Sequence, residues 1–434
     1  MKYYSTNGNA PIADLHKAVV KGLAEDRGLY MPEQIKKLPK AFFDNIQDMK
    51  FQDIAYNVAS AFFGEDVDLD ALKDIVYDTL SFDCPVVKVK ENIYSLELFH
   101  GPTLAFKDVG ARFMARLLQY FIRQEGQHEQ VNVLVATSGD TGSAVANGFL
   151  GVEGIHVYVL YPKGKVSPIQ ECQFTTLGKN ITAIEVDGVF DDCQALVKSA
   201  FMDEALNQHM KLTSANSINV ARFLPQAFYY FNAYARMKAQ DKADQLVMCV
   251  PSGNFGNICA ALFGHAMGLP IKRFIAANNV NDVFYNYLQT GKYEPKASVQ
   301  TLANAMDVGD PSNFARIYDL YGKSHERITS LISGATYNDE QIKETMRQCY
   351  KETNYILDPH GACGYQALVD GLQEDEVGVF CETAHPAKFK EKVDDILGID
   401  VDIPDRLSAF MKGEKQSVPM TKDFMDFKAY LMKQ

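Results

Sequence analysis

The chain has 434 residues, of which 47% are hydrophobic and 23% are charged, and its formal net charge is −12. This length predicts two or three domains with a core large enough to fold without disulfides or metal. The negative net charge disfavours nucleic acid as a partner. The eight cysteines form no CxxC pair, the first residues contain no apolar signal segment, and no apolar run suits a membrane span. These features predict a cytoplasmic protein without a metal site.

Residues 1–84 are expected to form a small helical module. Apolar residues recur at helical spacing from Ile12 to Leu23 and predict a helix that ends near Gly28. Two further short helices are expected at residues 51–63 and 69–80. The pattern changes at Pro85, so we place a domain boundary before this residue.

Short apolar runs then alternate with helical segments. The runs lie at 131–137, 155–161, 181–186, 245–251, 271–278 and 376–383, and one of the helices is expected at 190–206. Continuous apolar strands separated by helices predict parallel sheets that are covered on both faces. These units are too many for one small domain. We therefore expect an α/β fold with two doubly wound parallel-sheet domains, at residues 85–220 and 221–434, after the N-terminal module.

The segment SLELFHGPTLAFKDVGARF (95–113) contains the first candidate functional residue. Lys107 lies between a loop and a helix that is expected to begin near Asp108, and it has the apolar neighbours Leu104, Phe106 and Val109. A partly desolvated lysine has a lowered pKa and can act as a nucleophile or base near neutral pH. Taken alone, one of 43 Lys and Arg residues is more often a solvated surface cation.

Two Gly-rich loops each follow an apolar run and precede a helix, at the strand ends where parallel sheets bind ligands. In TSGDTGSA (137–144), main-chain N–H groups and the hydroxyls of Thr137, Ser138 and Thr141 suit a carboxylate. PSGNFGN (251–257) suits a phosphate, although it is neither a Walker A loop nor a dinucleotide fingerprint. Taken alone, each loop is also compatible with an ordinary strand–helix turn.

Two further segments carry polar residues at helix starts or strand ends. SANSINVAR (214–222) places Asn216, Ser217 and Arg222 together, which is typical of a phosphate site. The alternative is a helix capped by Asn219 with a solvated arginine. FCETAHPAKF (380–389) places Thr383 at the carboxyl end of a strand, where it faces a ligand or caps a helix.

The motifs HGPTLAFKD, ATSGDTGSA, NSINVAR, PSGNFGN and ETAHPAKF together resemble the threonine synthase family, which belongs to fold type II of the pyridoxal-phosphate enzymes. They occur in that family's order and approximate spacing. The early KGLAEDRGLYMPE resembles the family's N-terminal module, so the similarity extends over essentially the whole chain. Five motifs in this order and spacing are far more specific for the family than any one of them alone.

This resemblance implies pyridoxal 5′-phosphate (PLP) as the cofactor, held as a Schiff base by Lys107, with Thr383 at its pyridine nitrogen. The residues that it implies for the cofactor phosphate are Gly253, Asn254, Phe255, Gly256 and Asn257. Those implied for the substrate carboxylate are Thr137, Ser138 and Thr141, and those for a substrate phosphate are Asn216, Ser217 and Arg222. Asp140 stands where related enzymes often have Asn near the cofactor's 3′ oxygen, so the partner of that oxygen stays open.

The implied reaction converts O-phospho-L-homoserine and water to L-threonine and phosphate, the last step of threonine biosynthesis. It would make the protein a carbon–oxygen lyase acting on phosphates, with no protein, nucleic-acid or membrane partner. Lys107 would carry protons from the substrate's Cα and Cβ. A threonine dehydratase or a cysteine synthase shares the lysine and both loops, but it lacks the long N-terminal module and the NSINVAR segment. A non-catalytic relative is disfavoured by the intact lysine and loops, and a nicotinamide dehydrogenase by the missing fingerprint.

Overall fold

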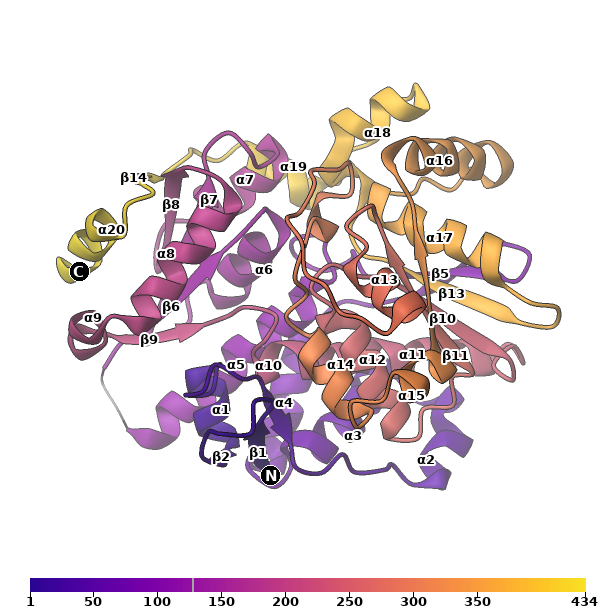
Figure 1. The fold of residues 1–434 in the computed structure, drawn as a ribbon, viewed down its shortest axis with the longest axis horizontal. Helices are drawn as coiled ribbons and strands as arrows, with labels where there is room; N and C mark the ends of the chain where they lie inside the picture. The colour runs from indigo at the N-terminus through magenta and orange to yellow at the C-terminus, as the bar shows by residue number, and fades with distance from the viewer. Residues whose placement is uncertain (127–128) are drawn as a thin grey trace.

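The protein is described by a computed structural model over residues 1–126 and 129–434. Two large sheets lie side by side, and the N-terminal module covers one side of both (Figure 1). A single large apolar cluster contains side chains from the module and from one face of each sheet. The three parts therefore share a continuous core.

The N-terminal module contains a small antiparallel sheet in addition to helices. Its strands, in the order β2-β1-β3, are β1 (Lys2–Ser5), β2 (Ala13–Asp14) and β3 (Tyr30–Pro32). Its helices are α1 (Leu15–Lys21), α2 (Lys40–Asn45), α3 (Phe51–Phe63) and α4 (Leu69–Thr79). The expected helices at 51–63 and 69–80 are confirmed. The small sheet was not expected, because its strands are too short to show an apolar alternation.

The first helix is shorter than the apolar spacing predicted. The Asp14 side chain accepts a hydrogen bond from Lys17 N and so caps the start of α1, which ends at Gly22. Ile12 and Leu23 lie outside the helix and are exposed. The expectation of one helix from Ile12 to near Gly28 is therefore wrong at both ends.

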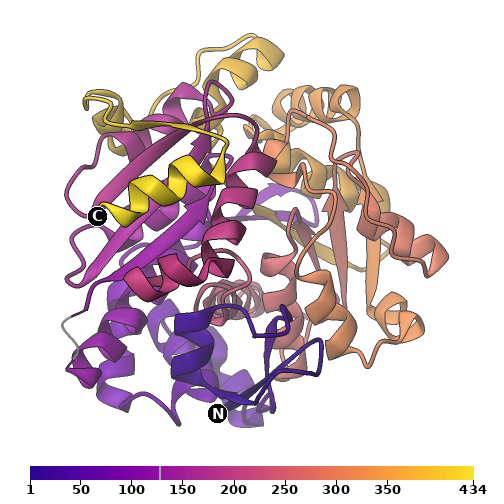
Figure 2. The same cartoon turned by 60° about the vertical axis from the view of Figure 1, so that its left-hand side comes forward.

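The five-stranded sheet is entirely parallel, in the order β14-β8-β7-β6-β9. Its strands are β6 (Val131–Ala136), β7 (Ile155–Pro162), β8 (Ile181–Asp187), β9 (Lys211–Ser214) and β14 (Val418–Thr421). The helices around it are α5 (Lys107–Glu125), α6 (Asp140–Phe149), α7 (Pro168–Thr175), α8 (Phe190–Met202), α9 (Glu204–His209) and α20 (Phe424–Met432). Alternate residues of β6 and β7 pack toward α8 and α20 or toward α5 and α6, so both faces are covered. Figure 2 shows α20 lying over this sheet.

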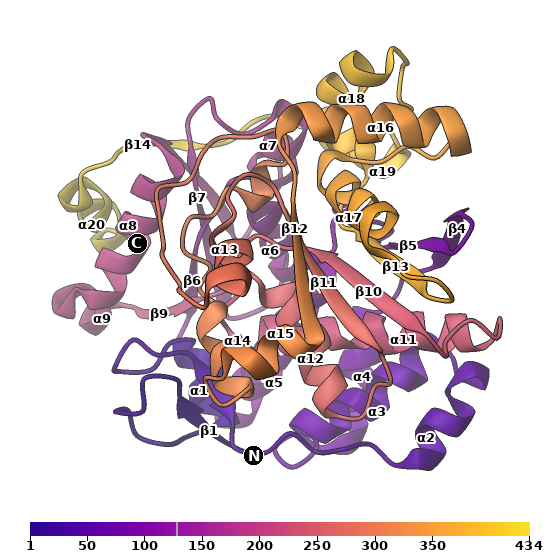
Figure 3. The same ribbon diagram turned by 45° about the vertical axis from the view of Figure 1, so that its right-hand side comes forward.

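The six-stranded sheet has the order β12-β11-β10-β13-β5-β4 and is parallel except for β4, which runs antiparallel to β5. Its strands are β4 (Val86–Lys90), β5 (Ile93–Glu97), β10 (Leu246–Pro251), β11 (Arg273–Asn278), β12 (Ile332–Thr336) and β13 (Val377–Glu382). Helices α11 (Ala227–Lys238) and α12 (Gly256–Ala266) cover one face, and α16 (Asp339–Thr353), α17 (Pro359–Gly371) and α18 (Lys390–Leu397) cover the other (Figure 3). The remaining α-helices are α10 (Val220–Phe223), α13 (Val283–Thr290), α14 (Phe314–Leu320), α15 (His325–Leu331) and α19 (Asp405–Met411).

The predicted architecture of two parallel sheets flanked by helices is confirmed, but strand pairing crosses the expected domain boundaries. β4 and β5 precede residue 220, yet they join the sheet whose other strands all follow it. β14 near the C-terminus joins the sheet formed by residues 131–214. The ranges 85–220 and 221–434 therefore do not each contain one sheet. Local hydropathy marks a buried strand, but it does not record which sheet the strand enters.

The loop after β5 runs antiparallel to the segment after β13. Phe106 N donates to Thr383 O at 2.8 Å, and His385 N donates to Leu104 O at 3.0 Å. Helix α5 begins immediately afterwards, at Lys107. This pairing places Lys107 next to the carboxyl end of β13. Within the described ranges, no helix is both long enough and apolar enough to cross a membrane.

The packing of α20 on the five-stranded sheet can be tested by substitution. Phe427 is buried against the α8 side of this sheet, so Phe427→Ala is expected to destabilise the protein by roughly 3–5 kcal/mol. Met425 lies in the same helix and is 63% exposed, so Met425→Ala is expected to change stability by less than about 0.5 kcal/mol. Urea unfolding of both variants measures the difference, and equal midpoints would contradict the packing of this helix.

Candidate active site

Lys107 is the first residue of α5, and its amine lies among charged groups that are themselves buried. Desolvation lowers the pKa of Lys107 to about 8. The cations of Arg222 and Lys388 add to this shift, and the carboxylate of Asp140 opposes it. A substantial fraction of the amine is therefore neutral near physiological pH, as a nucleophile or a base requires.

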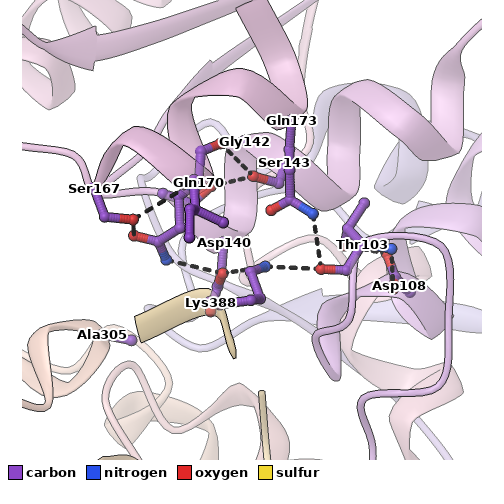
Figure 4. A network of polar contacts seen from close by, with 12 residues as sticks. Thr103, Asp108, Asp140, Gly142, Ser143, Ser167, Gln170, Gln173, Ala305 and Lys388 are labelled. Atoms are coloured by element: carbon purple, nitrogen blue, oxygen red, sulfur yellow. Dashed lines mark hydrogen bonds and ion pairs between the residues drawn. The ribbon is translucent and has the colours of Figure 1, made fainter. Parts of the chain in front are cut away.

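Asp140 and Lys388 form a buried ion pair (Figure 4), and both of its charges act on the Lys107 amine. Lys388 Nζ lies 2.5 Å from Asp140 Oδ1 and donates to the carbonyl oxygen of Thr103 at 2.8 Å. Gln170 Nε2 donates to the same Asp140 oxygen at 3.0 Å. Burial alone would raise the pKa of Asp140, but Lys388 and Lys107 outweigh burial and lower this pKa to about 2. Asp140 is thus a carboxylate at neutral pH. The sequence analysis did not single out Lys388.

The loop between β6 and α6 is shaped by Thr137. Its Oγ1 accepts hydrogen bonds from Gly139 N at 2.9 Å and from Gly142 N at 2.8 Å. Ser138 and Thr141 are only partly buried, and their hydroxyls have no hydrogen-bond partner within the part of the chain that the structure describes. The start of a helix favours an anion because its first N–H groups are unpaired. Ser138 and Thr141 are therefore free to bind a carboxylate, whereas Thr137 supports the loop.

The main-chain N–H groups of residues 253–257 form a row of free donors at the start of α12. None of them donates to a protein acceptor within the described residues. Phe255 has a φ of 66°, which turns the chain into the left-handed region before the helix begins. A Cβ atom on Gly253 would lie 2.3 Å from the Ala305 carbonyl oxygen, so only glycine fits there. Such a row of N–H groups at a helix start is suited to a phosphate.

The side chains of Asn254 and Asn257 bind protein groups. Asn254 Nδ2 donates to Ser217 Oγ at 2.5 Å, and Asn254 Oδ1 accepts from Ser312 N at 2.7 Å. Asn257 Nδ2 donates to Pro251 O at 2.8 Å. These asparagines therefore shape the loop, and the donors that it offers to an anion are main-chain N–H groups rather than side-chain amides.

Arg222 is buried and, among the described residues, has no carboxylate partner. Its Nη1 donates to Ala215 O at 2.7 Å, and its Nε has no hydrogen-bond partner among the described residues. Desolvation lowers the pKa of Arg222 to about 10, so the guanidinium remains charged at neutral pH. The alternative of a solvated arginine is wrong, although Asn219 does cap α10 by accepting from Ala221 N. A buried cation without a counter-ion, close to Lys107, favours an anionic ligand.

The remaining candidates lie beside these groups. Ser217 contacts the loop at residues 253–257 through Asn254. Asn216 directly precedes Ser217, and both are partly buried. Thr383 directly follows β13 as predicted and is buried. Its hydroxyl makes no hydrogen bond to any described residue, and its carbonyl oxygen accepts from Phe106 N. The five sequence motifs are thus connected in space, although they are widely separated along the chain.

Arg316 joins three segments around the site, and the sequence analysis did not identify it. Its Nε and Nη2 donate to Tyr30 O of β3 at 3.1 and 2.9 Å. Nη2 also donates to Ile218 O at 2.6 Å, and Nη1 donates to Asn313 Oδ1 at 2.8 Å. The guanidinium lies 4.1 Å from the centre of the Phe223 ring. One buried cation therefore links the N-terminal module to the loop that precedes Arg222. The sequence around Arg316 contains no recognisable motif, so the residue could not be distinguished from any other polar residue of a helix.

Three family models match the chain. A model described as pyridoxal-phosphate dependent enzyme matches residues 79–381. A model of the threonine synthase N terminus matches residues 2–80, and one of the threonine synthase C-terminal region matches residues 361–431.

Individual proteins agree with these models. The threonine synthase of Haemophilus influenzae is 45% identical over 96% of both chains, and that of Escherichia coli is 44% identical over 94% of both. The crystal structure of the E. coli threonine synthase superposes with a TM-score of 0.93, at 42% identity and full coverage of both chains. The PLP-bound threonine synthase of Brucella melitensis has the same TM-score at 33% identity, covering 100% of this chain and 99% of its own. Maize serine racemase, at 14% identity and a TM-score of 0.54, shares the fold alone.

The fold and the site define a pyridoxal-phosphate-dependent enzyme of fold type II. The residues present suit this cofactor, because the free N–H groups of 253–257 can hold its phosphate and the Lys107 amine can bind its aldehyde. Within this class, the chain belongs to the threonine synthase family, as the sequence motifs indicated. In the described part of the chain, no cluster of His, Cys, Asp or Glu could hold a metal ion.

The close approach of Gly253 to Ala305 leads to a test of the phosphate loop. A methyl group at this position would push the two loops apart, so Gly253→Ala is expected to weaken PLP binding by at least about tenfold, or ~1.4 kcal/mol. Gly371→Ala is the matched control, because its Cβ atom would have no neighbour closer than 3.5 Å. Titration of the apoenzymes with PLP, followed by absorbance, measures both affinities. An unchanged affinity in Gly253→Ala would argue against this loop as the phosphate site.

Proposed function

We propose that this protein is a threonine synthase that converts O-phospho-L-homoserine and water to L-threonine and phosphate, the last step of threonine biosynthesis. This activity makes it a carbon–oxygen lyase acting on phosphates. The observation that carries the proposal is the arrangement around Lys107, where an amine with a lowered pKa adjoins a buried arginine without a counter-ion. Membership in the threonine synthase family supports the same reaction.

The proposed site binds one substrate at both of its anionic ends. Ser138 and Thr141, at the start of α6, would bind the carboxylate, and Thr137 would hold their loop in place. Arg222, with Asn216 and Ser217 beside it, would bind the phosphate group. A phosphate would supply the counter-ion that Arg222 lacks in the protein itself.

PLP, when bound, supplies an electron sink for the charge that develops at the substrate's Cα. Lys107 would hold the cofactor covalently, and its free amine would remove the substrate's Cα proton and then a Cβ proton. Phosphate would leave from Cγ, protons would be returned to Cγ and finally to Cα, and water would add its hydroxyl at Cβ, with its second proton going to the released phosphate. Thr383 would offer a neutral hydroxyl to the pyridine nitrogen, and without a carboxylate there that nitrogen would be largely unprotonated. The N–H groups of residues 253–257 would hold the cofactor's phosphate in place throughout.

The place of this reaction in the cell is proposed on chemical grounds. All eight cysteines are free thiols, and seven of them are buried. A cytoplasmic location, where thiols stay reduced, stays a prediction. The proposed reaction needs no macromolecular partner, since both of its substrates are small molecules.

Removal of Lys107 tests the central assignment. Lys107→Ala is expected to lower the rate of phosphate release from O-phospho-L-homoserine by at least ~10²–10⁴-fold, because it removes the proposed proton carrier. Borohydride should fix the cofactor to the wild type but not to this variant. Lys40→Met is a suitable control, because the Lys40 side chain is 87% exposed and lies in α2, outside the site. Full activity of Lys107→Ala would refute the assignment.

The lowered pKa of Lys107 predicts how cofactor loading depends on pH. Only the neutral amine attacks a carbonyl, so the rate at which PLP reloads the apoenzyme should rise with pH and level off above about 8. An unperturbed lysine, with a pKa near 10.4, would give a rate that still rises through pH 9.5. Stopped-flow absorbance at constant ionic strength distinguishes the two profiles.

The role of Arg222 is tested by substrate choice. The wild type should use homoserine far less well than O-phospho-L-homoserine, because homoserine leaves the buried guanidinium unpaired. Arg222→Met should lower kcat/KM for O-phospho-L-homoserine by at least about a hundredfold and have little effect on homoserine. Similar kcat/KM values of the wild type for both substrates would contradict the phosphate site. Release of a keto acid from threonine at a comparable rate would instead indicate a threonine dehydratase.

A further inference from the structure

The Asp140–Lys388 pair joins the two large sheets at the proposed site. Asp140 begins α6, and Gln170, its second partner, lies in α7, so both come from helices that surround the five-stranded sheet. Lys388 follows β13, and Thr103 follows β5, so both lie in segments that continue from strands of the six-stranded sheet. The Thr103 carbonyl oxygen accepts from Lys388 at 2.8 Å and from Gln173 of α7 at 3.1 Å. Figure 4 shows these contacts converging on one small volume.

Stability alone does not account for this pair. Lys388 is fully buried and Asp140 is 6% exposed, so both charges have lost nearly all of their hydration. Replacing a buried ion pair by neutral groups of similar size is often neutral or stabilising. A neutral pair would thus serve the packing equally well. What a neutral pair cannot reproduce is the placement of two opposite charges beside Lys107.

The charges around Lys107 are few and can be named. Asp140 is the negative group that acts on its amine, and Arg222 and Lys388 are the positive ones. The adjacent carboxylate of Asp108 is buried and accepts hydrogen bonds from Thr103 N and Oγ1. An unshielded carboxylate this close would favour the protonated amine and so remove the nucleophile and base. The Lys388 ammonium lies 2.5 Å from the same carboxylate and opposes this effect.

We propose that Lys388 is a positioning residue for the reaction, which fixes the start of α6 against Lys107 and shields the Lys107 amine from the Asp140 carboxylate. This inference rests on the proposed function, because it assigns Lys107 the roles of nucleophile and base. It gives Lys388 no contact with the substrate. Lys388 acts through Asp140, the first residue of the helix that also contains Thr141.

A double-mutant cycle tests the proposal through the pH midpoint of PLP reloading of the apoenzyme, a readout that is independent of turnover. Lys388→Met leaves the carboxylate unshielded and should raise the midpoint by about one pH unit or more, a tenfold loss of neutral amine. Asp140→Asn removes this carboxylate but keeps the cations of Lys388 and Arg222, so it should lower the midpoint. The double variant Asp140→Asn/Lys388→Met removes both charges and should return the midpoint to within about 0.5 of the wild type.

Opposite shifts that cancel in the double variant support the proposal, whereas shifts of the same sign, or none, overturn it. If Lys388→Met does not fold, Asp140→Asn and the double variant decide, because a downward shift in the first must disappear in the second. Lys40→Met is the matched control, since it breaks the exposed pair of Lys40 and Asp44 and should leave the midpoint unchanged. Phosphate release from O-phospho-L-homoserine by the wild type distinguishes a failure of the proposed function from a failure of the role proposed for Lys388. Its absence refutes the proposed function, whereas its presence with uncorrelated midpoints refutes only the role of Lys388.

Discussion

The site depends on the pairing of two short main-chain segments that are far apart in the sequence. The loop after β5 and the segment after β13 are joined by hydrogen bonds from Phe106 to Thr383 and from His385 to Leu104. This pairing is antiparallel, unlike the parallel pairing of β5 with β13, and it holds the start of α5 against the end of β13. Lys107, Thr383 and Lys388 are thereby brought together by the main chain, before any side-chain contact is made.

A chain with a net charge of −12 builds a site in which buried cations outnumber buried carboxylates. Lys107, Lys388 and Arg222 accompany the two carboxylates of Asp140 and Asp108, and Arg316 supports the adjoining loop. Buried cations of this kind are costly unless an anion accompanies them. A cofactor and a substrate that both carry phosphate would complete this balance. The proposed affinity for anions is therefore local and does not follow from the overall charge.

Much of the fold could be predicted because strands buried on both faces leave continuous apolar runs, as β6, β7 and β10 do. The strands that the sequence did not predict, such as β1 and β4, are short or exposed on one side. Their residues therefore form no continuous apolar run. The motifs located the loops of the site because loop geometry needs particular small residues at fixed spacing. Lys388 and Arg316 could not be predicted from residues alone, because their roles come from partners distant in sequence. The roles of the site residues stay predictions.

The position of β14 at the edge of the five-stranded sheet has a consequence for biosynthesis. β14 pairs with β8, and the strands β9 to β13 are all made between these two partners. A chain emerging from the ribosome therefore carries an unprotected strand edge at β8 until nearly all of it has been translated. Exposed strand edges invite pairing with other chains. Premature termination just before β14 should thus yield aggregates rather than a shortened but soluble enzyme.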